Sequence, residues 1–505
     1  MKTNTESPLT SLPSYSLPAG LRSFLILLAS GLICLCFSDI EISNYNTGHE
    51  FGLMLDGLLH PKLLPLQELI EALLQTISYA ILAVMTAAAA GFILNFGYRQ
   101  PLIRVTCTLI RSIHELFWGL LFIQLFGIHP LSGFLAIAVP YSGIFAKVFA
   151  EIREEHRCQS ITPPHSDSVS RFFYGHWPQL KPHFASYTRY RLECGLRSST
   201  ILGFIGLPTL GFHLETAFMQ GMYSQTAGLL LLFYGLVATL PIWFRFRLVP
   251  FYSLLALYFL WPEQAIYGAS LNTFLQDIIP APLSNPSSIP FQSWAGMILI
   301  QQIIPGVTNT LLLSQVALFF TALLALLLFP LVSKHFFNWP ARLTGHGLLI
   351  LLRSTPELII AFALLILFGP SMLPAIIALT IHNAAIIANL IGRQSNQLLL
   401  RLDASQGISR YSFEILPKLY GPFLALLCYR WEVILRESAI LGILGIHTLG
   451  FFIDSAFERF ELDTALVLIL VSALLNISVD QGSRWLRHTL HLSKHLKPDT
   501  NYPAK

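Results

Sequence analysis

The chain contains few charged residues. Asp, Glu, Lys and Arg make up 11% of its 505 residues, whereas about a quarter of the residues in soluble domains are charged. Hydrophobic residues make up 54%, and uncharged apolar runs such as 227–244 and 311–332 are long enough to cross a bilayer. This composition excludes an ordinary soluble domain. We therefore expect an all-α polytopic protein whose immediate partner is the lipid bilayer.

Motifs for catalysis and for cofactor binding are also missing. No Gly-Lys dipeptide occurs, which excludes a P-loop for ATP. The six cysteines show neither metal-ligand spacing nor a paired framework, and we interpret them as small buried hydrophobic residues. The histidines are scattered, and no nucleophile motif surrounds a Ser or His. We therefore expect no metal, no cofactor and no enzymatic activity, and the net charge of +4 gives no reason to expect a nucleic-acid partner.

One stretch of the chain occurs twice. Residues 190–212 and 429–451 are identical at 14 of 23 positions and lie 239 residues apart, about half the chain. Each half of the chain contains six apolar segments: four before the repeated stretch, the repeated stretch itself, and one after it. We therefore predict about 12 transmembrane helices in two six-helix repeats, residues 1–247 (core about 67–247) and 248–505 (core about 307–487). An even number of spans per repeat gives both repeats the same orientation, so the repeats are parallel. The expected spans are 21–38, 67–97, 106–127, 131–149, 184–205 and 226–244, then 249–261, 307–332, 347–369, 373–391, 422–445 and 464–479.

Lys and Arg are distributed unevenly between the two sides of the membrane. Four alternate segments contain only two such residues, Lys62 and Arg459; these segments are 39–62, 207–225, 262–295 and 446–463. The remaining connections hold nearly all the other Lys and Arg outside the spans. Cytoplasmic loops carry the excess of positive charge. We therefore place both termini and the long loops 151–183 and 392–421 in the cytoplasm.

Both repeats carry charged residues inside apolar segments. Isolated charges at the bilayer centre cost about 2.5–3.5 kcal/mol each on insertion scales, so these side chains are expected to face the helix bundle. We expect Arg111 and Glu115, four residues apart, to share one helix face. Across helices, we predict that Arg111 pairs with Glu193, and Glu115 with Arg191 or Arg197. The complete predicted network is Arg111, Glu115, Arg191, Glu193 and Arg197 in the first repeat, and Arg353, Glu357, Arg430, Glu432 and Arg436 in the second.

This charge network has two interpretations. It either clamps helices together and gates the path, or its surplus arginines meet an anionic solute, because guanidinium binds phosphoryl oxygens through paired hydrogen bonds. Glu437 cancels the surplus in the second repeat, and the charges lie nearer the cytoplasm than the midplane. We favour the structural or gating interpretation on these grounds.

A second repeated feature lies in the cytoplasmic loops. Residues 168–172 align with 407–411, and Pro178 aligns with Pro417. A short helix bounded by such a proline, just before a span, can lie on the membrane face and dock against a soluble partner. The candidate docking residues are Ser168, Ser170, Arg171, Pro178, Gly407, Ser409, Arg410 and Pro417.

These motifs together resemble those of the permeases of ABC-type phosphonate importers. The resemblance rests on Gly-x-Ser-Arg, Tyr-Arg-Trp-Glu, Leu-Arg and Leu-Gly-x-x-Gly in order, on Arg-Ser-x-Pro-Glu at 353–357, and on Val-Asp-x-x-Ser-x-x-x-Arg at 479–487. It covers both repeat cores. Two departures occur in the loops: Ser168 replaces the loop glycine, and Arg401-Leu402-Asp403 stands where importers generally have Glu-Ala-Ala.

The resemblance implies a type I importer permease in the bacterial inner membrane, with two permease units fused in one chain. It implies that the cytoplasmic loops couple to a separate ATP-binding subunit, present in two copies, and that a periplasmic binding protein delivers the substrate. The substrate would be phosphonate, phosphite, phosphate or a similar anion. The family's gate region would correspond to Gly206, Gly211, Gly445 and Gly450.

Two other functions remain open from the residues alone. An ion-coupled secondary transporter could use the intramembrane Glu residues as proton sites. An intramembrane enzyme is the least supported, because no catalytic constellation is present. The duplicated cytoplasmic loop favours the ATP-driven importer, since a pair of ATPase subunits needs two matching docking segments.

Overall fold

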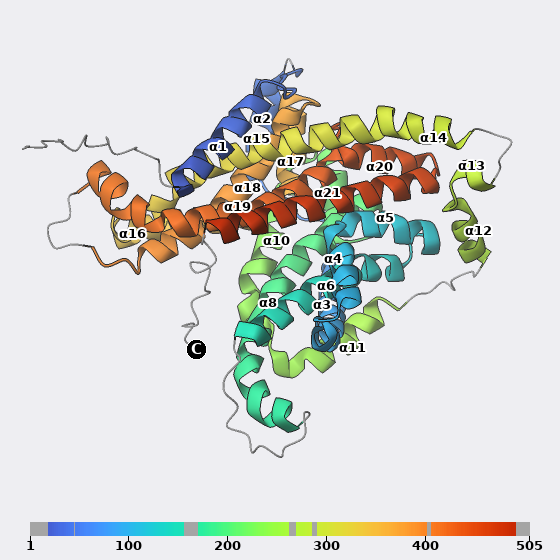
Figure 1. Ribbon diagram of the computed structural model, residues 1–505, viewed down its shortest axis with the longest axis horizontal. Coiled ribbons are helices and arrows are strands. Elements are labelled where there is room, and N and C mark those ends of the chain that lie inside the picture. The colour runs from blue at the N-terminus through green and yellow to red at the C-terminus, as the bar shows by residue number, and fades with distance from the viewer. Residues whose placement is uncertain are drawn as a thin grey trace, which may run out of the picture.

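The computed structural model describes residues 19–44, 46–155, 170–261, 269–284, 290–400 and 406–490, which form helices and no strand (Figure 1). The helices up to the middle of the chain are α1 (Ala19–Leu35), α2 (Thr47–Leu59), α3 (Leu66–Gly97), α4 (Pro101–Ser112), α5 (Glu115–Phe126), α6 (Pro130–Glu155), η1 (Arg171–His176), α8 (Trp177–Ile201), η2 (Leu202–Ile205), α9 (Leu210–Met219), α10 (Tyr223–Trp243) and η3 (Phe246–Leu248). The others are α11 (Val249–Phe259), α12 (Ala269–Asp277), α13 (Ala281–Ser284), α14 (Phe291–Ile298), η4 (Leu299–Ile303), α15 (Ile304–Leu328), η5 (Phe329–Val332), α16 (Trp339–Ser354), α17 (Glu357–Phe368), α18 (Met372–Ser395), η6 (Arg410–Ile415), α19 (Leu416–Ile440), η7 (Leu441–Leu444), α20 (Leu449–Glu458) and α21 (Leu462–Thr489).

The protein is an all-α polytopic membrane protein. Six helices in the described part of the chain are long and apolar enough to cross a membrane, and the number rises to ten if each of four bent helix pairs is one span. Two shorter apolar helices, Leu21–Leu35 and Phe246–Phe259, fall at the predicted first span of each repeat. The count of twelve and the parallel orientation of the repeats stay predictions.

Two of the predicted spans are broken in the middle. The expected span 106–127 consists of α4 and α5, which meet at 91°, and the span 347–369 consists of α16 and α17, which meet at 87°. In the second repeat Pro356 precedes Glu357, and the residue before this proline has extended backbone, as sterics require. In the first repeat no proline is present. There the His114 ring Nδ1 accepts a hydrogen bond from the Leu116 amide at 3.1 Å. This cap lets α5 begin at the position equivalent to the start of α17.

This break corrects the prediction that Arg111 and Glu115 share a helix face. Arg111 lies in the last turn of α4 and Glu115 in the first turn of α5. The spacing of four residues has its usual meaning only within one continuous helix. The break instead places the two side chains on helices that point in different directions.

The two halves of the chain are interlocked. Helix α1 packs along α15 and also meets α19, whereas α11, from the start of the second repeat, packs on α3 (Figure 1). Helix α4 packs against α21 near the end of the chain. The predicted boundary at 247/248 rests on the sequence repeat. It stays a prediction, because helices on one side of it pack against helices on the other.

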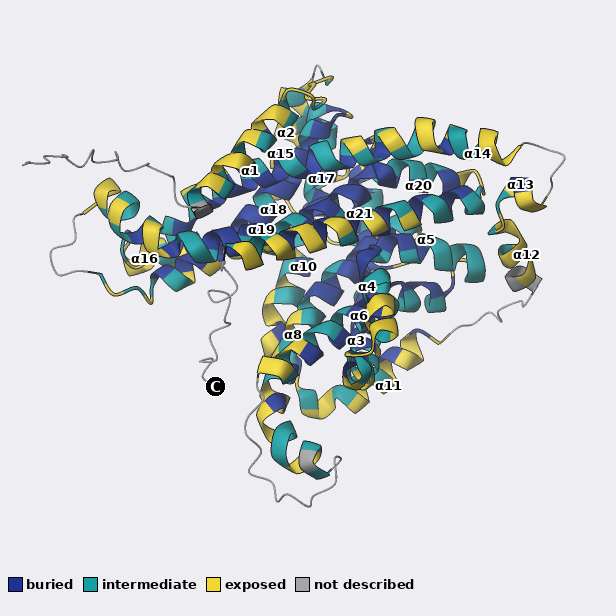
Figure 2. Ribbon diagram, viewed as in Figure 1, coloured by how far each residue is buried: buried dark blue, intermediate teal, exposed yellow. Residues whose placement is uncertain are grey.

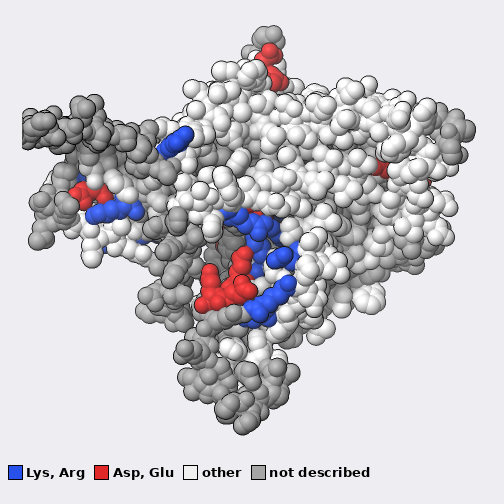
Figure 3. All heavy atoms as spheres, viewed as in Figure 1, with Lys and Arg blue, Asp and Glu red and all other residues white. Residues whose placement is uncertain are grey.

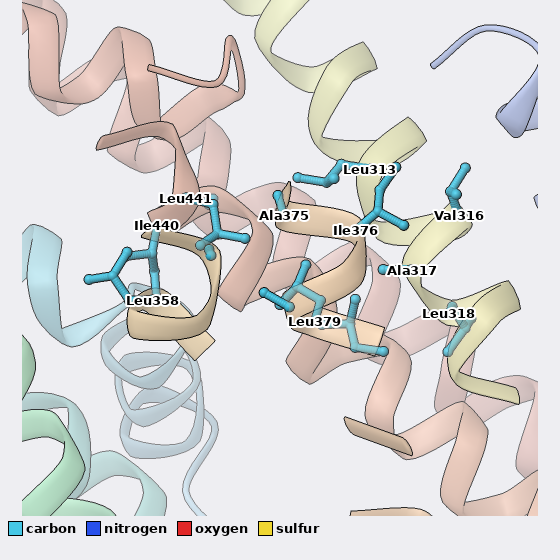
Figure 4. Packing of buried hydrophobic residues seen from close by; sticks show 14 of the residues in the cluster. Leu313, Val316, Ala317, Leu318, Leu358, Ala375, Ile376, Leu379, Ile440 and Leu441 are labelled. Atoms are coloured by element: carbon cyan, nitrogen blue, oxygen red, sulfur yellow. The ribbon is translucent and has the colours of Figure 1, made fainter. Parts of the chain in front are cut away.

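The largest hydrophobic core belongs mainly to the second half but includes residues of the first. Leu313 of α15 lies next to Ala375 and Ile376 of α18 (Figure 4), and Leu27 of α1 belongs to the same cluster. Buried residues concentrate where the helices cross, and exposed residues lie on outer helices such as α1, α2 and α14 (Figure 2). Many of these exposed residues are apolar, for example Ile33 at 61% exposure, as expected of a surface that faces lipid.

Candidate functional site

A cavity of about 220 Å³ lies between helices of both halves. On the face shown in Figure 3, charged side chains gather in a hollowed region near α4, α6 and α8, while most of the surrounding surface is uncharged. The cavity lining contains six cationic side chains and four carboxylates. They are Arg111, Lys147, Arg191, Arg197, Arg430 and Arg436, with Glu115, Glu357, Glu432 and Glu437.

Arg111 joins the two halves through a buried ion-pair network. Its Nη1 donates to Glu432 Oε1 at 3.1 Å, and its Nη2 donates to Asp480 Oδ2 at 2.7 Å. Arg436 Nη2 donates to the same Glu432 oxygen at 3.1 Å, and Arg484 also pairs with Asp480. Arg111, Glu432 and Asp480 are all buried. Such a network is favourable only while every member keeps its partners.

The predicted pairing of Arg111 with Glu193 is therefore wrong. Arg111 reaches α19 and α21 of the other half because α4 packs against α21. Glu193 instead lies 4.0 Å from Arg353 of α16, and this pair is partly exposed. In both pairs the arginine lies in the last turn of the helix before a break, α4 or α16, and the glutamate belongs to the other half. The prediction pairs residues within one half, whereas the observed pairs join the two halves.

Glu115 is held by neutral groups rather than by the predicted arginines. Ser198 Oγ donates to Glu115 Oε1 at 2.7 Å, and the Tyr141 hydroxyl lies 3.0 Å from the same Ser198 oxygen. The His114 ring is 3.4 Å from the other carboxylate oxygen. Within the described ranges, Glu115 forms no ion pair with Arg191 or Arg197 at 4.0 Å or less, so that prediction is also wrong. The hydrogen bond from Ser198 satisfies one carboxylate oxygen locally.

Arg197 crosses from α8 to the second half. Its Nη1 donates to His382 Nε2 at 3.1 Å and to the carbonyl oxygen of Arg353 at 3.4 Å. His382 Nδ1 lies 3.0 Å from the Thr355 carbonyl oxygen, so this network assigns the proton to Nδ1 and leaves Nε2 as the acceptor. Glu357, His382 and Glu437 present three possible metal-ligand atoms within 4.8 Å of one another. The lone pair of His382 Nε2, however, is used by Arg197.

Arg191 and Arg430 occupy equivalent positions in the repeated stretch and both line the cavity. The Arg191 guanidinium lies over the Tyr141 ring, 4.0 Å from its centroid, and its Nε is buried without a hydrogen-bond partner. Arg430 Nη1 donates to Asn383 Oδ1 at 3.3 Å, and the Asn383 amide donates to Glu437 at 3.0 Å. Both arginines are thus positioned by uncharged side chains.

Among the glycines of the predicted gate region, Gly206 and Gly445 lie in tight turns after η2 and η7, and Gly211 and Gly450 lie in the first turns of α9 and α20. Gly206 and Gly445 have φ of 84° and 83°, a left-handed conformation that favours glycine. A Cβ atom on Gly211 would lie 1.7 Å from the Thr200 carbonyl oxygen, and one on Gly450 would lie 1.6 Å from that of Ala439. These contacts fold α9 and α20 back against the preceding helices. The gating role of the four glycines stays a prediction.

The predicted docking segments extend the spans rather than forming separate helices. Segments η1 and η6 run directly into α8 and α19, whose first turns contain Pro178 and Pro417. A π-helical turn precedes each proline, and we attribute the continuity to this wider turn, which accommodates the missing amide donor. Ser168 and the side chain of Arg171 lie outside the described residues. Ser170 and Ser409 immediately precede η1 and η6.

Segment η6 is tied to the helices beside it. Arg410 Nη1 donates to the His335 carbonyl oxygen at 3.1 Å, and the Tyr411 ring stacks on Phe329. Burial lowers the pKa of His335, and its ring Nε2 lies 2.9 Å from the Ser395 carbonyl oxygen. A neutral imidazole that donates this hydrogen bond fits both observations. Gly407 begins the segment with φ of 65°.

Sequence reasoning missed several residues that the structure places at these sites. Tyr174 and Phe413, 239 residues apart, are 82% and 81% exposed on η1 and η6. Asp480, identified from the sequence only as part of a terminal motif, pairs with Arg111, and His382 accepts a hydrogen bond from Arg197. The sequence did contain a signal for Asp480. An aspartate near the end of an apolar span requires a cationic partner.

Comparison with characterised proteins gives two informative relatives. The chain is 24% identical over 463 residues to the phosphate-import permease protein PhnE of Mycolicibacterium smegmatis, covering 82% of this chain and 84% of that protein. It is 28% identical over 180 residues to the phosphite transport system permease protein PtxC of Stutzerimonas stutzeri, covering 34% of this chain and 66% of that protein. The chain is a homologue of these permease proteins.

The resemblance seen in the sequence is thereby confirmed, and the relatives are transport permeases rather than enzymes. The alignment with PhnE is longer than either half of this chain, so it includes residues of both repeats. No protein-family model and no solved structure matches the chain.

Proposed function

We propose that this chain is the membrane-spanning permease of an ATP-driven importer for phosphonate, phosphite or phosphate. The observation that carries this proposal is the cavity, which both halves enclose and in which cationic side chains outnumber carboxylates. A path for an anion requires such a balance, because an uncompensated charge in a low-dielectric environment is costly. The names of the two relatives, which refer to phosphate import and phosphite transport, agree with this substrate class.

ATP hydrolysis takes place on separate subunits in this proposal. Tyr174 and Phe413 project from equivalent segments, and each offers an exposed aromatic side chain to a groove on one of two ATP-binding subunits. In Figure 1 the beginning of α1, the end of α21 and η6 lie on the left and η1 lies at the bottom, whereas α12, α13 and α14 lie on the right. This arrangement supports a common cytoplasmic side for the docking segments and both termini, in the bacterial inner membrane. A periplasmic binding protein delivers the anion to the opposite side.

Co-purification tests the docking segments. The tagged full-length chain is expressed with a candidate ABC-type ATP-binding subunit from the same organism, and the retained subunit is quantified after purification in detergent. We expect Tyr174→Ala combined with Phe413→Ala to lose most of the bound ATPase, because each substitution removes a buried aromatic contact at the interface.

The matched control is Phe460→Ala, which removes an aromatic side chain that is 75% exposed outside these segments. It should leave the ATPase bound. Retention of the ATPase by the double variant would contradict docking through η1 and η6. Absence of ATPase from the unmodified chain, together with uptake driven by a proton gradient, would favour a secondary transporter.

A further inference from the structure

We propose that Arg191, Arg197 and Arg430 form a binding site for a tetrahedral phosphorus oxyanion in the central cavity. This inference rests on the proposed function and deepens it, because it assigns substrate contact to three particular residues of the permease.

The three arginines differ from the other arginines of the cavity in their partners. Arg111 and Arg436 both donate to Glu432, so a carboxylate already balances their charge. In the part of the chain that the structure describes, no carboxylate lies within 4.0 Å of the guanidinium groups of Arg191, Arg197 or Arg430. An arginine that only joins helices is expected to pair with a carboxylate. An arginine that binds an anion needs a guanidinium group without a carboxylate partner.

Uncharged groups hold these three side chains in place. Arg191 lies over the Tyr141 ring, Arg197 donates to His382 Nε2, and Arg430 donates to Asn383 Oδ1. Neutral anchors of this kind orient a guanidinium without neutralising it. The buried Nε of Arg191, which has no hydrogen-bond partner, leaves a donor available to a ligand.

The symmetry of the repeats explains why the site lies between the halves. Arg191 of α8 and Arg430 of α19 are equivalent residues, so they approach one cavity from two sides. Arg197 has Arg436 as its counterpart, but Glu432 holds Arg436. The third guanidinium therefore comes from the first half only, and the site is asymmetric.

The size and lining of the cavity define the ligand class. A cavity volume of about 220 Å³ is far above the roughly 10–15 Å³ that a single water needs, so the cavity has room for a small oxyanion with some of its hydration. Guanidinium groups bind phosphoryl oxygens through paired N–H donors. The apolar residues of the lining, among them Ile144, Val148 and Val433, leave room for a hydrogen or alkyl substituent on phosphorus. Phosphite and small alkylphosphonates fit this volume, carry phosphoryl oxygens, and have a hydrogen or a small alkyl group on phosphorus.

Glu437 sets the strength of this site. It lines the same cavity and stands where the first repeat has Ser198. Its negative charge opposes an incoming anion, so restoring the serine of the first repeat should strengthen binding. A residue with only a structural role would not improve anion binding when it is removed.

Phosphorus NMR on the full-length protein in a phosphorus-free detergent tests the site, with phosphite, methylphosphonate and inorganic phosphate as probes. Line broadening on titration reports even weak binding. We expect Arg191→Ala and Arg430→Ala each to weaken binding by about tenfold or more, as for the loss of a charge-assisted hydrogen bond. Glu437→Ser should tighten binding several-fold, and the charge-conserving Arg191→Lys should fall between Arg191→Ala and the unmodified protein.

The matched control is Arg189→Ala, which removes an exposed positive charge two residues away on the same helix. It should leave binding unchanged. Equal weakening by Arg189→Ala, or unchanged binding by Arg191→Ala and Arg430→Ala, would overturn the assignment. If those variants also import normally, the site is wrong and the importer function stands. If the unmodified complex neither binds nor imports these anions, the proposed function itself fails.

Discussion

Arg111→Ala is expected to destabilise the protein by roughly 3–5 kcal/mol, because it removes the cation that balances two buried carboxylates. Glu432 would keep Arg436, and Asp480 would keep only the more exposed Arg484. Since these residues join α4 to α19 and α21, the loss should weaken the connection between the halves. Thermal unfolding of the purified protein in detergent, followed by tryptophan fluorescence, measures the effect.

Two variants sharpen this prediction. Arg353→Ala breaks the equivalent but partly exposed pair with Glu193, at 4.0 Å, and should change stability by less than about 1 kcal/mol. Arg111→Met combined with Glu432→Gln and Asp480→Asn should recover part of the lost stability, because no unpaired carboxylate remains buried. The recovery is partial because Arg436 loses its partner Glu432. Equal effects of Arg111→Ala and Arg353→Ala would show that burial of the network does not determine its contribution.

Gly211→Ala and Gly450→Ala are each expected to reduce stability by roughly 3 kcal/mol or more through overpacking. The added methyl group would lie 1.7 Å or 1.6 Å from a backbone carbonyl oxygen, which cannot move as a flexible side chain can. We expect a lower yield of monodisperse protein and a lower melting temperature.

Gly235→Ala is the control, since no atom lies within 4 Å of its added Cβ. In a helix interior this change should be neutral or stabilising by up to about 1 kcal/mol. Unchanged stability of both Gly211→Ala and Gly450→Ala would mean that the turns after α8 and α19 are not packed as described.

The membrane class and most helix positions could be predicted because hydrophobic length and repetition are local properties of the sequence. The expected spans near 67–97 and 131–149, for instance, correspond to α3 and α6. Eight of the ten residues of the predicted charge network line the cavity, among them Arg191 and Glu432, whereas Glu193 and Arg353 do not.

The pairing of those charges could not be predicted, because it depends on how the halves interlock. Arg111 bonds residues 321 and 369 positions away in the chain, which no local pattern indicates. The breaks before α5 and α17 were also missed, although Pro356 stands at the second of them, because hydrophobic length alone indicates one continuous span in each case. The structure distinguishes the arginines of the network by their partners. Arg111 is paired with two carboxylates, whereas Arg191 and Arg430 have no carboxylate within 4.0 Å among the described residues. Both interpretations of the network stay predictions.

Uptake by reconstituted proteoliposomes tests the central claim most directly. The chain is incorporated with its ATP-binding subunit, the periplasmic binding protein is placed opposite, and entry of radiolabelled phosphite or methylphosphonate is followed. We predict uptake that requires ATP on the ATPase side, persists without a proton gradient, and is strongly reduced by Arg191→Ala combined with Arg430→Ala. Uptake that needs a proton gradient and proceeds without the ATP-binding subunit would contradict the account.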